Sequence, residues 1–398
     1  MRKKLLSIVL GVMLTFSTIA PVSALTDYID DGVSEKFLSL GSINAYNRFD
    51  ACIKKNAGAT ILVSKDSFLS DGLSASGLIG ARNANMVPVY RVNGKSAIYW
   101  EQIVTKDVYI IGGEKAVSRE LENNLIKAGY NVKRLQGRNR YETSYSVARE
   151  IARFTHINTV AIINGRNGQA DAVSIASAAI KKKMPVIVTD GKKLNSNLKS
   201  VKVYAIGGKS VISQSLVNKT RATRVAGKNR FETNKNIIKR FYPGCKKFTI
   251  LESKLAHRSF AVRPITANQP IVLVDVKSDK SVLSGAKELK FVYFKDLHPN
   301  IESSCLAGAG GSGVYKAYET LYKKLGSSRE DMCYLYNQKG NYADKASLRR
   351  DYYIFNILNI FNENGEYDMT EWDSNYFVHK KTMKIYSYGP DHVLRFVK

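Results

Sequence analysis

A ten-residue phrase occurs twice in this chain, 90 residues apart, and this repetition constrains the fold more than any other feature. Arg134–Thr143 reads RLQGRNRYET, and Arg224–Thr233 reads RVAGKNRFET. The centre of the phrase, Asn-Arg followed by an aromatic and an acidic residue, also stands at Asn47–Asp50. A repeat of this length is too long for a solenoid unit and has the size of a small domain. The sequence therefore predicts tandem domains of one kind.

Two further features recur in the same order and at a similar interval. Val108–Ser118 reads VYIIGGEKAVS, and Val203–Ser213 reads VYAIGGKSVIS. A proline opens an apolar run at Pro88, Pro185 and Pro270. Three features repeated in one order indicate three copies of one unit, of which the middle copy is the clearest.

The repeated features predict strands, turns and helix starts. The β-branched and aromatic run before each Gly-Gly pair has the pattern of a strand that enters a tight turn. Asn139 can cap the helix that the phrase opens, and the side chain of Glu142 can return to the N–H group of the cap. Gly137 and Gly227 are interpreted as turn residues that need a positive φ. The residues to which we assign a structural role are Asn139, Glu142, Thr143, Asn229, Glu232 and Thr233, with Gly112, Gly113, Gly207 and Gly208 in the turns.

The alternation of Val- and Ile-rich strands with helical segments predicts right-handed crossovers and a parallel sheet between two helix layers. No Gly-, Ser- or Pro-rich linker separates the copies, so we expect one compact body. The predicted fold class is α/β, with three tandem Rossmann-like three-layer modules followed by a small α+β C-terminal domain. The predicted division is a signal peptide at 1–24, a lead at 25–37, modules at 38–131, 132–221 and 222–297, and the C-terminal domain at 298–398.

The N-terminus predicts export. Arg2-Lys3-Lys4, the apolar run Leu5–Ile19 and the small residues before the predicted cleavage after Ala24 have the pattern of a secretory signal peptide. The apolar run is short for a bilayer span. We therefore expect an exported protein with no membrane span after signal cleavage.

The sequence indicates neither a metal nor a cofactor. The four cysteines are too few and too scattered for a disulfide framework, and no Cys/His cluster has metal-ligand spacing. The Gly-Gly pairs follow strands, where nucleotides bind in doubly wound folds, but their spacing is not GxGxxG. We expect plain turns there.

The basic charge is concentrated in the repeats. The chain has a formal charge of +27, and residues 297–398 contribute only 13 basic and 12 acidic side chains to it. Residues 1–296 hold the other 48 basic and 22 acidic side chains. Such an excess attracts polyanions. Nucleic acid is not the partner that we expect, because the sequence carries no recognisable base-reading motif or stacking platform.

The combination of RxxGxxR[YF]ET, the strand Val-Tyr-x-Ile-Gly-Gly and an Ala-rich helix that starts Asp-Ala-Val-Ser resembles the clostridial cell wall binding repeat 2 family. The resemblance covers residues 38–297. It implies three modules arranged as a triangular pseudo-trimer. It also implies non-covalent attachment to an anionic secondary polysaccharide of the Gram-positive cell wall, often within an S-layer, with S-layer proteins as further partners.

The arginines of the phrases leave two roles open. Each could pair with the neighbouring acidic residue and hold the turn. Each could equally present a planar fork to a phosphate beside a helix N-terminus, which offers further donors to an anion. We take them as candidate polymer-binding residues and name no catalytic residue. These arginines are Arg48, Arg134, Arg140, Arg224 and Arg230.

The C-terminal region shows no functional motif. Cys305–Gly313 is interpreted as a flexible joint, and Val314–Leu325 and Leu348–Phe361 are predicted helices. Met383–Tyr388 is a predicted strand, and Asn364-Gly365 indicates a hairpin.

Two functions remain from different classes. The first is a non-covalent anchor, located at the cell wall and surface, whose three modules bind the polymer and display the C-terminal domain. The alternative is a wall-acting enzyme, a peptidase or amidase in the C-terminal domain, that the same modules bring to its substrate.

Overall fold

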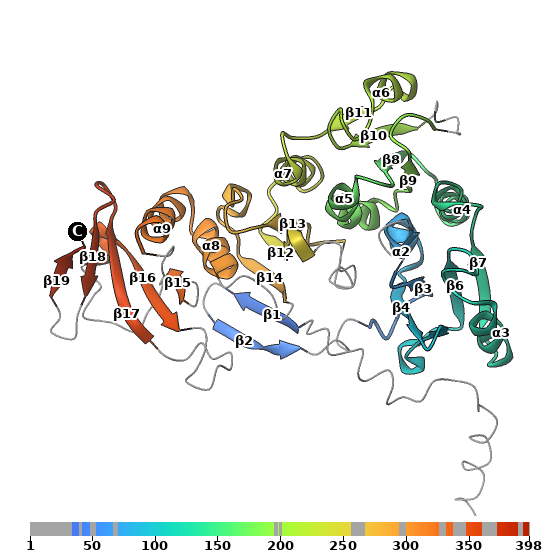
Figure 1. Cartoon of the computed structure of the whole chain (residues 1–398), viewed down its shortest axis with the longest axis horizontal. Coiled ribbons are helices and arrows are strands. Elements are labelled where there is room, and N and C mark those ends of the chain that lie inside the picture. Colours follow the sequence, from blue (N-terminus) through green and yellow to red (C-terminus); the bar gives the residue numbers. More distant parts are fainter. Residues whose placement is uncertain are drawn as a thin grey trace, which may run out of the picture.

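The computed structural model describes residues 34–39, 42–47, 53–66, 71–194, 198, 201–255, 267–293, 300–325, 332–336, 348–359, 372–388 and 393–397. These residues form four sheets (Figure 1). Three of the sheets are built around parallel strands, and the fourth is antiparallel. The chain is therefore a mixed α/β protein with several parallel sheets, as the sequence predicts.

The first sheet has the strand order β5-β4-β3-β6-β7. Its strands are parallel except β5, which forms a hairpin with β4. Ile61 and Val63 of β3 belong to one buried cluster and Leu62 to another, so both faces of this sheet are covered. The elements are β3 Thr60–Ser64, η3 Leu73–Ala75, α2 Ser76–Arg82, β4 Asn85–Val92, β5 Lys95–Ala97, η4 Trp100–Gln102, β6 Asp107–Ile111, α3 Arg119–Lys127 and β7 Asn131–Leu135.

The second sheet repeats this arrangement with the order β9-β8-β10-β11, and all its strands are parallel. Side chains of β8 again alternate between two clusters, Ala161 and Ile163 on one face and Ile162 on the other. The predicted layers, a parallel sheet between helices, are thus present. The elements are α4 Arg140–Ala152, β8 Thr159–Asn164, α5 Gln169–Lys182, β9 Val186–Thr189, β10 Lys202–Ile206, α6 Gln214–Thr220 and β11 Thr223–Val225.

In the third sheet, the first three strands have the same order as in the other two sheets, but the fourth strand comes from a different part of the chain. Strands β13, β12 and β14 are parallel, as in the other sheets. The place of β7 and β11 is taken by the N-terminal strand β1, which pairs antiparallel with β14 and continues into β2. The elements are β1 Ser34–Ser39, β2 Ser42–Asn47, α7 Arg230–Phe241, β12 Lys247–Glu252, η5 Ser253–Leu255, β13 Ile271–Val274, η7 Ser281–Leu283, β14 Glu288–Tyr293 and α8 Asn300–Ala309.

The course of the chain explains this exchange of strands. After β6 and β10, the chain forms the outer helices α3 and α6 and then returns as the fourth strand. After β14 it forms α8, whose Ile301 and Cys305 lie in the same buried cluster as Phe291 of β14. It then continues into the C-terminal region instead of returning. The fourth position therefore remains for the N-terminal strand.

These sheets divide the chain differently from the predicted modules. Residues 34–47, assigned to the lead and the first module, pair with the third sheet. Strand β7, most of which was assigned to the second module, belongs to the first sheet. Helix α8, assigned to the C-terminal domain, packs in the cluster of the third sheet.

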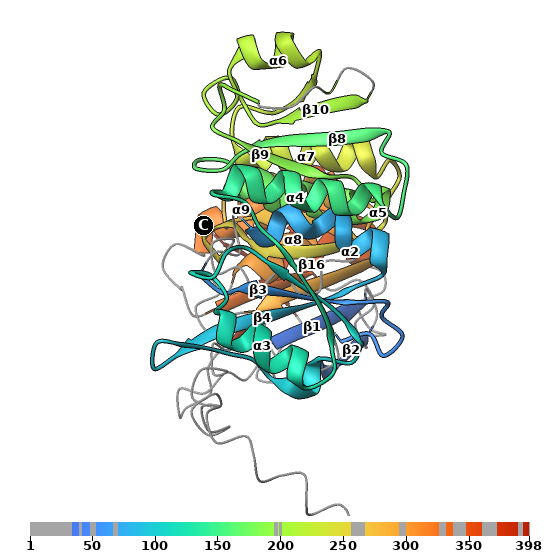
Figure 2. The ribbon, with the colours of Figure 1, turned by 90° about the vertical axis from the view of Figure 1, so that its right-hand side faces the viewer.

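Four helices, α2, α4, α5 and α7, lie between the sheets (Figures 1 and 2). Helix α5 contacts α2 of the first unit and α7 and β13 of the third, and α4 contacts both α2 and β9. One buried cluster accordingly contains side chains of all three sheets, among them Ile61, Ile163 and Ile250. The units therefore share one core.

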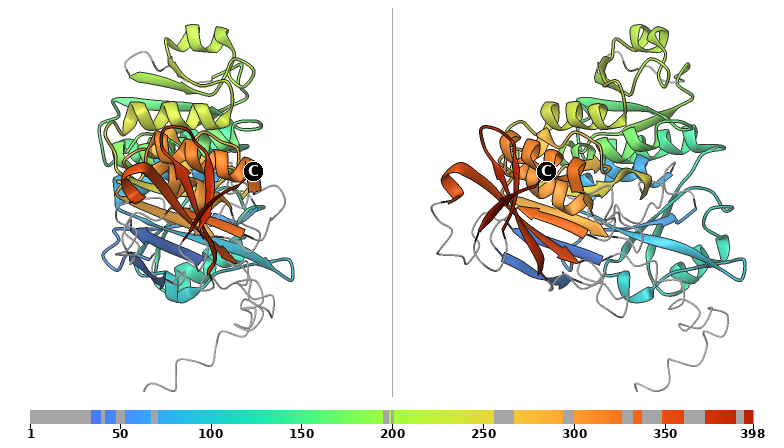
Figure 3. Two further views of the ribbon diagram at one scale, coloured as in Figure 1. Left: turned by 90° about the vertical axis from the view of Figure 1, so that its left-hand side faces the viewer. Right: turned by 60° about the vertical axis from the view of Figure 1, so that its left-hand side comes forward.

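The C-terminal region lies at one end of the molecule, beside the third sheet (Figure 3). Its antiparallel sheet has the order β15-β16-β17-β18-β19. Helix α9 packs Tyr318 and Leu321 against Phe355 of β16 and Val378 of β17. The elements are α9 Ser312–Leu325, β15 Met332–Tyr336, α10 Leu348–Asp351, β16 Tyr352–Asn359, β17 Trp372–His379, β18 Ile385–Tyr388 and β19 Leu394–Phe396.

Two predictions for this region are wrong. The small residues of Cys305–Gly313 do not form a flexible joint, because α8 includes Cys305–Ala309 and α9 starts at Ser312. The predicted helix Leu348–Phe361 ends after one turn and continues as β16, whose aromatic and β-branched residues favour a strand with partners on both sides. The predicted helix Val314–Leu325 is confirmed by α9, and the predicted strand Met383–Tyr388 is confirmed by the strand Ile385–Tyr388. The predicted hairpin turn, Asn364-Gly365, lies outside the described residues.

Candidate anion-binding pocket

The capping residues of the phrase hold the starts of α4 and α7. The side chain of Asn139 accepts hydrogen bonds from the N–H groups of Tyr141, at 3.0 Å, and Glu142, at 3.1 Å. Asn229 accepts the equivalent pair from Phe231 and Glu232, both at 3.0 Å. These asparagines therefore cap their helices, as predicted.

The glutamates and threonines complete the caps in a way that differs from the prediction. Glu142 accepts from the N–H group of Arg138, the residue before the cap, and not from that of the cap itself. Glu232 accepts in the same way from Lys228, at 2.9 Å. The hydroxyls of Thr143 and Thr233 accept from the N–H groups two residues before each cap, at 3.2 and 2.9 Å.

Gly137 and Gly227 are required by close packing and not by a positive φ, which corrects the sequence interpretation. Neither residue is among the glycines of positive φ. A Cβ atom on Gly137 would lie 2.2 Å from the Cβ of Glu142, and one on Gly227 would lie 2.2 Å from that of Glu232. The side chain of each glutamate can therefore pack back against its cap only because position 137 or 227 is a glycine.

The first arginine of each phrase is held inside its own unit. Arg134 donates to the carbonyl of Gly112 at 2.9 Å and pairs with Glu122 at 2.9 Å, and its side chain is only 5% exposed. Arg224 donates to the carbonyls of Gly207 and Ile212, both at 2.8 Å, and burial lowers its pKa. These two arginines fasten the fourth strand of a sheet to the adjacent Gly-Gly turn.

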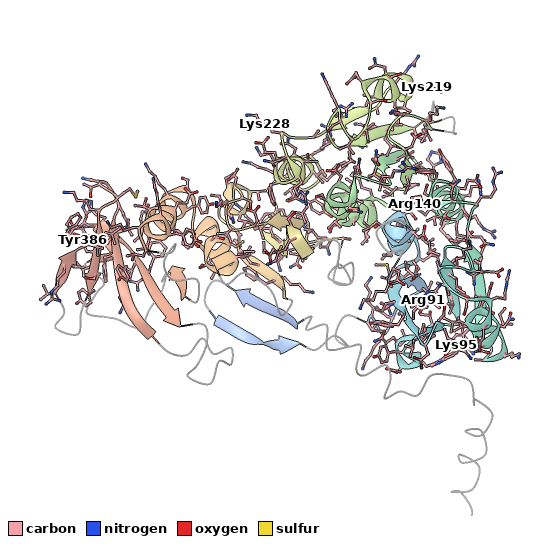
Figure 4. All side chains as sticks on the ribbon, in the orientation of Figure 1. Arg91, Lys95, Arg140, Lys219, Lys228 and Tyr386 are labelled. Carbon is pink, nitrogen blue, oxygen red and sulfur yellow. The ribbon has the colours of Figure 1, made fainter. Side chains whose placement is uncertain are left out.

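The second arginine of each phrase lies at the helix start and reaches the next sheet. Arg140, the first residue of α4, donates to the carbonyl of Gly165 at 2.7 Å, and Arg230, the first residue of α7, donates to the hydroxyl of Ser253 at 3.3 Å. Both arginines are exposed. Arg140 is labelled in Figure 4, as is Lys228 on the loop before α7. The fifth candidate, Arg48, lies outside the described residues.

Arg230 lines a pocket of about 360 Å³ where the second sheet meets the third. The pocket lies beyond the carboxyl ends of β8, β10 and β12, the edge at which parallel sheets usually bind ligands. Three cationic side chains surround it, and the start of α5 adds N–H groups without a side-chain cap. Its lining residues are Asn167, Gln169, Ala170, Asp171, Gly208, Ser210, Val211, Gly227, Lys228, Asn229, Arg230, Thr233, Ser253 and Lys254.

Asp171 is the acidic residue of this pocket. Its side chain accepts no hydrogen bond from any residue that the structure describes, although the residue is only 7% exposed. Burial raises the pKa of its carboxyl to about 6, while the charge of Arg230 acts in the opposite direction. The pocket therefore contains a carboxylate that has a nearby cation but accepts no hydrogen bond from the described residues.

The carboxyl of Asp171 also explains why the first residue of the Gly-Gly turn is a glycine. Gly207 has a φ of 115°, and a Cβ atom on it would lie 2.5 Å from Oδ2 of Asp171. In the first unit, Gly112 has a φ of 103°, and its Cβ would lie 2.9 Å from Oδ2 of Asp71. Both glycines thus adopt a conformation that disfavours side chains, next to an aspartate. Gly113 and Gly208 have no positive φ.

Neither aspartate is among the site residues predicted from the sequence, although the sequence carries a signal for both. Asp71 and Asp171 each precede a small residue, an aliphatic residue and a serine, and they are 100 residues apart, close to the period of the phrase. No aspartate stands between Ser253 and Ala267, the corresponding part of the third unit.

The described residues contain neither a membrane-spanning helix nor a cluster of metal ligands. Among them, no helix is both long and apolar enough to cross a membrane. No group of His, Cys, Asp and Glu side chains in the same part of the chain gathers as metal ligands do.

Comparisons with known proteins agree with this organisation. The family described as cell wall binding domain 2 (CWB2) matches residues 134–217 and 224–317. N-acetylmuramoyl-L-alanine amidase LytC of Bacillus subtilis (strain 168) is 28% identical over 221 residues, which are 51% of this chain and 43% of LytC. The amidase enhancer of the same organism is 31% identical over 193 residues, 46% of this chain and 26% of that protein.

A solved structure shows the same likeness. Cwp8 from Clostridium difficile superimposes with a TM-score of 0.52 at 28% identity, over 61% of this chain and 47% of Cwp8. The chain spans less than half the length of each of these three proteins. The matched segments include the repeated phrases and the pocket between them. Residues 134–217 and 224–317 are therefore two tandem repeats that match the cell wall binding domain 2 family.

Proposed function

We propose that this protein attaches non-covalently to an anionic polysaccharide of the cell wall and displays its C-terminal region at the cell surface, beside S-layer proteins. The family of its repeats supports association with the wall. The excess of basic side chains in residues 1–296 supports a polyanionic ligand.

The observation that carries the proposal is the pocket between the second and third sheets. Arg230, Lys228 and Lys254 supply positive charge at its rim, and Arg230 can offer a planar fork to a phosphate or carboxylate. We assign polymer binding to Arg230 and to its counterpart Arg140. Arg134 and Arg224 are engaged by their own units, so we give them a structural role.

We further propose that the three units follow a pseudo-threefold arrangement. In each of these three sheets, the three strands that come first in the unit lie in the same order: β4-β3-β6, β9-β8-β10 and β13-β12-β14. Each copy of the phrase begins at the end of the last strand of a sheet: the second copy in β7, the third in β11, and the first in β2, at Asn47. A chain that passes from each sheet to the next in this way supports a closed ring of three.

A sedimentation experiment tests the anchor. We expect the full chain to sediment with wall sacculi, to remain soluble after the anionic polymer is extracted, and to bind less tightly as salt increases, because cationic contacts release counterions. The full chain is used because a chain that ends at residue 297 would lack α8, whose buried side chains belong to the shared core. Equal binding to extracted sacculi would refute the proposed ligand.

The second candidate function is a wall-acting enzyme. The similarity to LytC, named as an amidase, favours it, although this chain spans only 43% of LytC. Zymography on purified walls distinguishes the two, since a peptidase or amidase clears the gel and an anchor leaves it opaque. We expect no clearing.

A further inference from the structure

The carboxyl of Asp171, to which no described residue donates a hydrogen bond, has no role in the binding of an anion by the cations of the pocket. An anchor for a polyanion needs cations, and the pocket has three. A largely buried carboxylate in the same pocket repels an anion and accepts no hydrogen bond from the described residues. Such a group is stabilised only when a donor reaches it.

We propose that Asp171 accepts a hydrogen bond from a sugar hydroxyl, so that the pocket binds a phosphodiester that carries free hydroxyl groups in preference to a bare phosphodiester. This inference rests on the proposed function and specifies which ligand group the pocket recognises.

The pocket places a hydrogen-bond acceptor, Asp171, and a cation, Arg230, near one another. Asp171 is the third residue of α5, and Arg230 is the first residue of α7 on the neighbouring unit. The charges of the two residues interact across the pocket. A glycosyl phosphodiester can therefore place its phosphate near Arg230 and the N-terminus of α5 while a hydroxyl donates to Asp171. The pocket, about 360 Å³, is within the range of small-molecule sites.

The same arrangement fixes the direction of the pH dependence. The charged side chains that line the pocket with Asp171 are Arg230, Lys228 and Lys254; Arg230 acts on the Asp171 carboxyl, and Lys254 pairs with Glu252 at 3.1 Å. A hydroxyl that donates to the carboxylate favours its ionised form, so a hydroxylated ligand should bind more weakly as the pH falls through about 6. A bare diester should bind more tightly over the same range.

Two singly charged probes test the proposal on the full chain: a glucosyl methyl phosphodiester and dimethyl phosphate, neither of which titrates in this pH range. We expect calorimetry at pH 7.5 to show that the wild type prefers the sugar diester by roughly tenfold, as a hydrogen bond to a charged group would give. In Asp171→Asn the preference should fall several-fold, with tighter binding of dimethyl phosphate. Asp351→Asn, the same change on an exposed residue of the C-terminal region, should leave it unaltered.

The outcomes separate this inference from the proposed function. The role of Asp171 would be overturned if both Asp171→Asn and Asp171→Ala still preferred the sugar diester to dimethyl phosphate. It would also be overturned if the two probes failed to show opposite pH trends. Either result would count even if the wild type sediments with sacculi. Failure of the wild type to sediment with sacculi would instead overturn the anchor. Circular dichroism of each variant shows whether it is folded.

Discussion

The repeated phrase places two arginines six residues apart, and the two lie in opposite surroundings. The first, Arg134 or Arg224, lies at the end of a strand and donates to carbonyls of its own unit. The second, Arg140 or Arg230, lies on the surface at a helix start and donates to a residue just after the first strand of the sheet that follows the phrase. Identical residue types in one short motif thus serve a structural role in one position and are available to a ligand in the other.

This difference has a physical origin. A strand end directs the first arginine toward the Gly-Gly turn, where buried carbonyls need donors. A helix start directs the second arginine toward solvent, beside N–H groups that attract anions. Substitutions at the first position should therefore affect stability, and those at the second should affect binding.

The largest effect is expected for Arg134→Ala. The change leaves the carboxylate of Glu122, whose side chain is 8% exposed, with only the exposed Arg119 as a partner at 2.9 Å, and should lower the free energy of unfolding by about 3 kcal/mol. Urea denaturation measures this loss. Arg224→Ala is the matched case, because no carboxylate among the described residues pairs with Arg224, and it should cost less. Equal losses would contradict the role given to the ion pair.

Asp171→Asn should stabilise the protein near neutral pH. The carboxyl of Asp171 has a pKa of about 6 in the folded state against an ordinary 3.8, so it favours folding below pH 4 and loses this contribution as the pH rises through 6. Removal of the charge should therefore raise the free energy of unfolding by about 2 kcal/mol at pH 7.5 and change it little at pH 4. Urea titrations at both pH values provide the measurement. A gain of the same size at pH 4 would rule out this explanation.

Arg230→Ala should weaken binding without unfolding the chain. Loss of a guanidinium that contacts a phosphate should lower the affinity for wall sacculi by roughly tenfold. Lys182→Ala removes an equal charge from an exposed position on α5 and should have a smaller effect. Thermal melting followed by circular dichroism must accompany both variants. Unchanged binding by a well-folded Arg230→Ala protein would return this arginine to a structural role.

The smallest effect is expected for the cap itself. Asn229→Ala removes the acceptor for two N–H groups of α7 and should cost about 1 kcal/mol of stability. Asn229→Ser, which restores an acceptor, should recover most of this loss in the same urea experiment. No recovery would show that Asn229 acts through something other than capping.

The sequence predicts the local features well because they depend on nearby residues. The strands before the Gly-Gly turns, the caps at Asn139 and Asn229 and the helix after Asp171 all follow from patterns within a few residues. The phrase also identifies the family correctly. The role of its two arginines could not be separated, because spacing alone does not show which one faces buried carbonyls.

Features that depend on distant residues were missed. Asp171 lies in an Ala-rich helix and resembles an ordinary first-turn acid, until the packing of α7 places Arg230 opposite it. Tyr352–Asn359 forms a strand because β15 and β17 pair with it, and this overrides its helical period. Nothing in Ser34–Ser39 indicates that its partner is β14.

That last pairing determines the order in which the protein can fold. Leu38 lies opposite Leu289, so β1 and its partner are separated by about 250 residues. During synthesis or export from the N-terminus, β1 emerges long before β14, whereas the parallel strands of the first two sheets each find partners within their own unit. Contacts this distant form slowly, and an unpaired strand edge invites association with other chains. The third sheet should therefore be the last to close, and chains interrupted before β14 should be prone to aggregate.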